Sequence, residues 1–119
     1  MGYTTKFKGR FDLSRKLTDN EERILRTFSA SRHNPALAPN YYCQWVPTAD
    51  CAGIEWDRVE KFYSYVEWLQ FIIDQFLELW GILLIGKILY QGEDLGDVGF
   101  VEVGVDQKVV KNPFLTKEN

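Results

Sequence analysis

The chain is poor in the residue types that most often carry chemistry. Its 119 residues contain one histidine, His33, and two cysteines, Cys43 and Cys51. His33 stands in a proline-containing loop with no sequence neighbour to orient it, whereas acid–base and metal sites need an oriented second group. Cys43 occupies an expected buried strand position without an adjoining basic residue, which disfavours a nucleophile. A disulfide is disfavoured too, because the expected turn directs Cys43 away from Cys51.

Neither a strong excess of one charge nor a long apolar run is present. The 14 basic and 17 acidic side chains give a formal charge of −3, which argues against nucleic acid as the main partner. The most apolar segment, residues 58–80, is interrupted by charged and amide side chains, whereas a membrane span needs about 20 nearly uninterrupted apolar residues. Residues 1–6 lack a signal-peptide core, so we expect a cytoplasmic protein without a membrane partner.

What the chain does have is ample apolar material for one core. Hydrophobic residues make up 45% of the sequence and aromatic residues 15%. A chain of this length buries roughly two-thirds of its unfolded surface, so no disulfide, structural metal or cofactor is needed to hold it together. We expect a single α+β domain over residues 1–112 and a C-terminal tail at residues 113–119.

An alternation of apolar and polar side chains marks residues 3–13 as a half-buried strand. Its odd-numbered side chains are expected to face the core. Its even-numbered side chains then place Lys6, Lys8 and Arg10 as a basic ladder on the other face. The spacing of Thr18 and Glu21 is that of a capping box, which predicts a helix from there to about Arg32.

A β-hairpin is predicted at residues 41–46 and 53–56, where short aromatic and β-branched runs flank a turn. Its buried face should carry Cys43, Trp45, Ile54 and Trp56. Its other face should carry Tyr42, Gln44 and Glu55.

A long amphipathic helix over residues 58–80 follows from apolar residues at spacings of three and four, and Gly81 is its expected end. Strands are predicted at residues 82–91 and 100–105. The resulting order is that of the ferredoxin-like βαββαβ two-layer sandwich. The extra C-terminal strand should pair as a hairpin with the fourth strand.

Several tryptophan-rich blocks resemble a family of small uncharacterised proteins of tailed bacteriophages, prophages and some actinobacteria. The most distinctive blocks are Cys43-Gln44-Trp45-Val46-Pro47, Glu60-Lys61-Phe62-Tyr63 and Gln91-Gly92-Glu93-Asp94. Together with shorter blocks, they extend over most of the chain. The resemblance implies a phage or prophage origin and no established activity.

Two departures from the family pattern affect the interpretation. Members often carry a long glycine-rich insertion before the Cys-Gln-Trp block, where this chain has only residues 33–41. Members also tend to have polar residues at the positions of Ile85 and Leu89. Whatever the insertion does is therefore absent here, and the two apolar side chains are particular to this chain.

The strand at residues 82–91 is apolar on both faces. If Leu84, Ile88 and Tyr90 face the core, the opposite face is apolar as well, and soluble monomers rarely leave such a patch open. We therefore expect a protein interface there, unless Val109, Val110 and Phe114 fold back to cover it. The expected interface residues are Leu83, Ile85, Lys87, Leu89 and Phe100.

Two other classes of function stay open. A small anionic molecule, such as a signalling nucleotide, would bind the basic open sheet face. The residues of that alternative site are Lys6, Lys8, Arg10, Tyr42, Gln44 and Glu55. A hydrolase or metal site would use two carboxylate clusters, although acidic turns also occur without any such role. The clusters are Glu55, Asp57 and Glu60, and Glu93, Asp94 and Asp97.

Of the three classes, the sequence favours a small non-enzymatic phage accessory protein. It would act in the bacterial host's cytoplasm by binding a host or phage protein, and one expected role is inhibition of an antiviral defence protein. A homodimer is an alternative use of the same apolar strand. No catalytic or metal-ligating residue is predicted.

Overall fold

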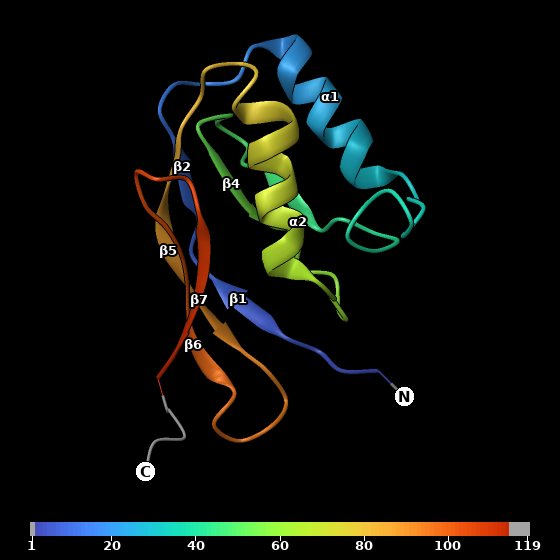
Figure 1. Cartoon of the computed structure of the whole chain (residues 1–119), viewed down its shortest axis with the longest axis vertical. Coiled ribbons are helices and arrows are strands. Elements are labelled where there is room, and N and C mark those ends of the chain that lie inside the picture. Colours follow the sequence, from blue (N-terminus) through green and yellow to red (C-terminus); the bar gives the residue numbers. More distant parts are fainter. Residues whose placement is uncertain (1, 115–119) are drawn as a thin grey trace.

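The computed structural model describes residues 2–114, which fold into a seven-stranded antiparallel sheet and two helices (Figure 1). The strands are β1 (Lys6–Lys8), β2 (Phe11–Leu13), β3 (Trp45–Pro47), β4 (Gly53–Trp56), β5 (Leu84–Gln91), β6 (Val98–Val103) and β7 (Val109–Pro113). The helices are α1 (Asp19–Ala30) and α2 (Tyr65–Ile72), and α2 continues into a π-helical turn, η1 (Ile73–Leu77).

The sheet is ordered β3-β4-β2-β5-β6-β7, and β1 also pairs with β5. The expected opening strand is present but divided, since β1 and β2 are separated at Gly9, whose φ of 117° is unfavourable for side chains with a Cβ. Both pieces keep one register against β5, with Lys8 opposite Leu89 and Asp12 opposite Ile85. The division of this strand and the addition of β7 raise the strand number above that predicted from the sequence.

Both helices lie on one side of the sheet (Figure 1) and cover its core face. Leu25 of α1 and Trp68 of α2 are buried there against Phe11, Trp45 and other inward side chains of the strands. The predicted capping box is present: the Thr18 hydroxyl accepts from the Glu21 amide, and the Glu21 carboxylate accepts from the Thr18 amide. Because the helices cover one face only, the opposite face of the sheet is left open.

The second helix is shorter than predicted. Residues 58–64 form a loop in which Arg58, Lys61 and Ser64 all have positive φ, so the helix begins only at Tyr65. The spacing of Phe62 relative to the later apolar residues predicts that it lies on the helix. Phe62 is indeed buried, but it reaches the core from the loop. Gly81, with φ of 72°, follows the end of the helical segment as expected.

The boundaries of the hairpin and of the C-terminal strands also differ from the prediction. β3 begins only at Trp45, so Tyr42 and Gln44 precede the strand. β6 pairs with β5, as predicted for the added strand, but it begins at Val98. β7 runs to Pro113, inside the segment predicted to be a tail, while residues 115–119 of that segment lie outside the described part of the chain.

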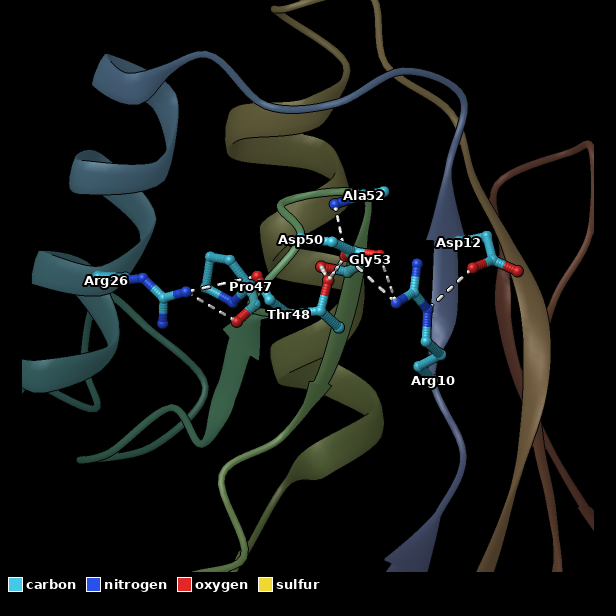
Figure 2. A network of polar contacts seen from close by, with 8 residues as sticks. All are labelled: Arg10, Asp12, Arg26, Pro47, Thr48, Asp50, Ala52 and Gly53. Carbon is cyan, nitrogen blue, oxygen red and sulfur yellow. Dashed lines mark hydrogen bonds and ion pairs between the residues drawn. The ribbon is translucent and has the colours of Figure 1, made fainter.

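An ion-pair network on the open face joins β2 to the β3–β4 turn (Figure 2). The Arg10 guanidinium contacts the carboxylates of Asp12 at 3.0 Å and Asp50 at 3.1 Å. Asp50 also accepts from the Thr48 hydroxyl and the Ala52 amide. These hydrogen bonds hold the pKa of the Asp50 carboxyl below its usual range, with Thr48 the largest cause.

The same turn is tied to α1 from its other side (Figure 2). The Arg26 guanidinium donates to the Pro47 carbonyl at 3.1 Å, and the Ser29 hydroxyl donates to the Trp45 carbonyl at 2.6 Å. The hairpin therefore has a fixed position relative to both the helix layer and the central strands. Within the described residues, no helix is long and apolar enough to cross a membrane.

Candidate functional site on the open face of the sheet

The open face of the sheet carries apolar side chains that the helices do not cover. Ile85 is 43% exposed and Leu83 is 44% exposed, while their neighbours Leu84 and Ile88 are buried. Leu89 and Phe100 lie directly opposite each other on β5 and β6, and both are partly exposed. The alternation along β5 thus sends one apolar set into the core and a second set outward.

The C-terminal strand adds to this surface instead of hiding it. The Phe114 amide donates to the Val98 carbonyl at 2.9 Å, which brings the Phe114 ring to 5.0 Å from the Phe100 ring, edge to face. Phe114 is nevertheless 51% exposed and Val110 is 46% exposed. The fold-back considered from the sequence therefore occurs, and it enlarges the exposed apolar area. We call this surface the open-face patch: Leu83, Ile85, Leu89, Phe100, Val110 and Phe114.

Charged side chains border and interrupt the open-face patch: Lys87 lies on β5 between Ile85 and Leu89, and Glu102 of β6, which is partly exposed, lies directly opposite it. The Lys87 ammonium lies 4.5 Å from the centre of the Phe100 ring, a cation–π contact. Lys6 and Lys8 point outward from β1, and neither takes part in an ion pair within residues 2–114. Arg10 is different, because Asp12 and Asp50 already neutralise its charge.

The remaining residues of the alternative ligand site are distributed over different surfaces. Glu55 is on β4, opposite Val46 of β3, and is partly exposed. Gln44 is buried instead of lying on the open face, and its side chain donates to the Glu60 carbonyl. Tyr42 and Gln44 together line a separate hollow outside the sheet. The basic ladder and these two residues therefore do not form one site.

The acidic turn residues hold the N-terminal segment in place. The Tyr3 hydroxyl donates to the Asp97 carboxylate at 2.5 Å and accepts from the Asp94 amide at 3.0 Å. The Glu93 carboxylate accepts from the Thr4 amide at 2.6 Å. Among the described residues, no group of three or more histidine, cysteine, aspartate or glutamate side chains is arranged to hold a metal ion.

The two residues considered as candidates for catalysis occupy packed positions. Cys43 is buried, and this burial is the main cause that raises the pKa of its thiol to about 12. His33 lies in the predicted loop but packs against the helices. Its ring packs 4.3 Å from that of Phe28 and 5.2 Å from that of Trp68, and its Nε2 atom lies 2.8 Å from the Phe28 carbonyl oxygen.

Sequence reasoning missed residues of the open-face patch and of the separate hollow. Phe114 was considered only as a cover, although strand pairing through Val98 places it beside Phe100. The tyrosines at positions 41 and 63, which converge with Tyr42 on the hollow, come from two loops whose approach no local pattern reveals.

No family model, curated protein or solved structure matches the chain.

Proposed function

We propose that this protein is a non-enzymatic binding module that acts by occupying another protein through the open-face patch. The observation that carries the proposal is the exposed apolar set on the uncovered sheet face, with Ile85, Val110 and Phe114 between 43% and 51% exposed. A contiguous apolar surface with a polar rim is typical of a protein interface. Burying such a side chain fully contributes about 1.5–3 kcal/mol relative to leaving it in water.

The charge pattern favours a partner of a different kind over a second copy of this chain. In a symmetric dimer each patch faces a copy of itself, so both sides would bring the cations Lys6 and Lys8, unpaired within residues 2–114, to the interface, whereas Lys87 has Glu102 opposite it on the neighbouring strand. Like charges across an interface oppose association. The preferred partner therefore has an apolar centre and an acidic edge that complements Lys6 and Lys8.

The resemblance of the Cys-Gln-Trp and Gln-Gly-Glu-Asp blocks to phage proteins supports a phage accessory role. Under this proposal the partner is a protein of the bacterial host, such as a component of antiviral defence, and the place of action is the host cytoplasm. Occupying a partner requires no catalytic group. The packed environments of Cys43 and His33 agree with that mode of action.

The alternative proposal, an anionic ligand on the basic ladder, has less support. It needs a free guanidinium at Arg10, whose two ion pairs with Asp12 and Asp50 already use the Nε and Nη1 atoms. Lys6 and Lys8 alone offer two flexible ammonium groups on an exposed strand. Such groups bind anions mainly as point charges and give little geometric selection.

We further propose that the part of the fold from β1 to β5 is a ferredoxin-like βαββαβ unit. If β1 and β2 count as one strand, the sequence of elements up to β5 has this order, and α1 and α2 lie on the same side. The strands β6 and β7 then extend the unit beyond β5. In this interpretation the open-face patch lies where the added strands meet the original sheet.

The proposal can be tested by affinity capture with matched variants. The wild-type protein, Leu89→Asp and Leu95→Asp would each be immobilised and exposed to lysate of the bacterial host, and the bound proteins would be quantified by mass spectrometry. Leu95 is a suitable control because it is fully exposed in the turn between β5 and β6 and lies outside the patch. An acidic residue at position 89 removes apolar contact and also opposes an acidic edge.

The expected result is a partner captured by wild type and by Leu95→Asp but reduced at least about tenfold with Leu89→Asp, as for a residue at the centre of an interface. Sedimentation velocity of the three proteins tests the homodimer alternative. If the wild type is a dimer and Leu89→Asp is a monomer, the partner of the open-face patch is a second copy of this chain and not a foreign protein. Equal capture by all three proteins would refute the proposal.

A further inference from the structure

A hollow of about 250 Å³ lies outside the open-face patch and shares no residue with it. Its walls come from two loops, the segment before β3 and the segment between β4 and α2. Three tyrosines, two side-chain amides and one ammonium group line it. These residues are Asn40, Tyr41, Tyr42, Gln44, Lys61 and Tyr63.

Hydrogen bonds hold the two loops together around the hollow. The Asn40 side-chain amide donates to the Ser64 hydroxyl at 3.1 Å, and the Tyr63 hydroxyl accepts from the Tyr3 amide at 3.1 Å. The Asp57 amide donates to the Gln44 carbonyl at 3.0 Å. The two loops are therefore held in place before any ligand arrives, which lowers the entropic cost of binding.

Gln44 provides the strongest indication of a ligand. Its side chain is 9% exposed, and its Nε2 atom donates over 3.4 Å to the Glu60 carbonyl. Its Oε1 atom is buried and has no hydrogen-bond partner within the described residues. Buried polar atoms in native proteins are nearly always paired, so this acceptor lacks a donor that a bound molecule can supply.

The other walls define the rest of the ligand. Tyr41, Tyr42 and Tyr63 are 42%, 53% and 45% exposed, and since Arg32 lies over one face of Tyr41, the rings of Tyr42 and Tyr63 are the more available for stacking. Lys61 contributes a positive charge to the hollow, and the Arg32 guanidinium lies 4.5 Å from the centre of the Tyr41 ring. These two cations favour an anionic group and disfavour a cationic one such as an arginine side chain.

We propose that this hollow binds a mononucleotide. Its base stacks on the tyrosine rings, an N–H group on the edge of the base donates to Gln44 Oε1, and its phosphate lies near Lys61. Stacking on aromatic side chains and hydrogen bonding at the base edge are the usual means by which proteins hold an unpaired base. Since Oε1 is closed to solvent in the unliganded chain, the side chains that cover it move when the base binds.

The test is isothermal titration calorimetry of the full chain with AMP, GMP, CMP and UMP as probes, and with ribose 5-phosphate as the probe that lacks a base. In parallel, the side-chain amide signals of ¹⁵N-labelled protein report on Gln44 directly. We expect at least one mononucleotide to bind about tenfold or more tightly than ribose 5-phosphate and to shift the Gln44 amide signal. Equal affinity for ribose 5-phosphate and for all four nucleotides would overturn the proposal.

Variants separate this hollow from a general attraction of anions to the surface. Tyr42→Ala and Gln44→Leu should each weaken binding about tenfold, whereas Lys108→Ala, which removes an exposed cation between β6 and β7, should leave it unchanged. Thermal melting shows which variants are folded. If Gln44→Leu does not fold, Tyr42→Ala still tests the proposal, because Tyr42 is an exposed side chain whose removal should leave the fold intact. Binding that is lost with Lys108→Ala but retained with Tyr42→Ala would contradict the assignment.

Discussion

Cys43 and Glu21 show how single residues respond to surroundings that a sequence does not display. Burial raises the pKa of the Cys43 thiol to about 12, because the thiolate would lose its hydration. The Arg15 guanidinium lowers the pKa of Glu21 to about 2, and desolvation opposes this effect only in part. The capping role of Glu21 was predictable from its spacing, but its partnership with Arg15 was not.

The burial of Cys43 predicts a protected thiol. In a Cys51→Ala variant, which carries Cys43 alone, native protein should react with a thiol reagent at pH 8 at least about a hundredfold more slowly than protein in denaturant. Cysteine content measured over time by absorbance checks this. Rapid labelling of the native variant would show that Cys43 is accessible.

Glu21 predicts a loss of stability in acid. Its pKa in the folded chain lies below the ordinary value of 4.5, so its stabilising contribution is complete above about pH 4.5 and is lost as the pH falls towards about 2. Glu21→Gln retains a capping side chain without the charge. Its free energy of unfolding should therefore fall less than that of wild type between about pH 5 and pH 3, where the Glu21 carboxyl takes up a proton in the unfolded chain but stays ionised in the folded one.

Urea unfolding at several pH values measures this difference, and Glu78→Gln, at an exposed position with no ion pair among the described residues, is the control. The control should follow the wild-type pH dependence. A Glu21→Gln curve parallel to that of wild type would show that the contact with Arg15 contributes nothing.

At the scale of elements, backbone conformation explains where the predicted boundaries failed. The apolar period extended the second helix back to residue 58, but positive φ values at Arg58, Lys61 and Ser64 prevent a helix there. Past Ile72 the chain enters a π-helical turn, in which the Glu78 amide donates to the Ile73 carbonyl five residues earlier. The spacing of apolar residues alone does not show whether a buried residue lies in a loop or on a helix.

Gly81 allows a direct test of this reasoning about boundaries. Its φ is 72° and no atom lies within 4 Å of the place a Cβ would occupy, so Gly81→Ala incurs backbone strain without a clash. We expect a loss of about 1 kcal/mol in the free energy of unfolding. Urea titration at neutral pH measures it.

Gly104→Ala is the matched control for that substitution. A Cβ at Gly104 meets only the Asp106 carboxylate, at 3.8 Å, and its φ lies outside the left-handed region. Its free energy of unfolding should change by less than about 0.5 kcal/mol. Equal effects at the two positions would contradict the assignment of strain to Gly81.

At the scale of the whole molecule, the alternation of apolar and polar residues predicted which side chains lie on each face of the sheet. It could not predict which distant side chains contact one another. The outward directions of Lys8 and Ile85 follow from strand period, and the structure places both on the open face. The neutralisation of Arg10 by Asp50 and the placement of Phe114 beside Phe100 depend on contacts between distant segments. Those contacts favour the open-face patch over the basic ladder as the binding surface.

The central claim is that the open-face patch contacts a protein partner, and methyl NMR tests it most directly. Protein with labelled isoleucine and leucine methyl groups would be titrated with the captured host partner. We expect the Ile85 and Leu89 signals to broaden or shift, while those of Leu95, in the exposed turn, and of Leu37, in the loop after α1, do not. Unchanged Ile85 and Leu89 signals in a saturated complex would contradict it.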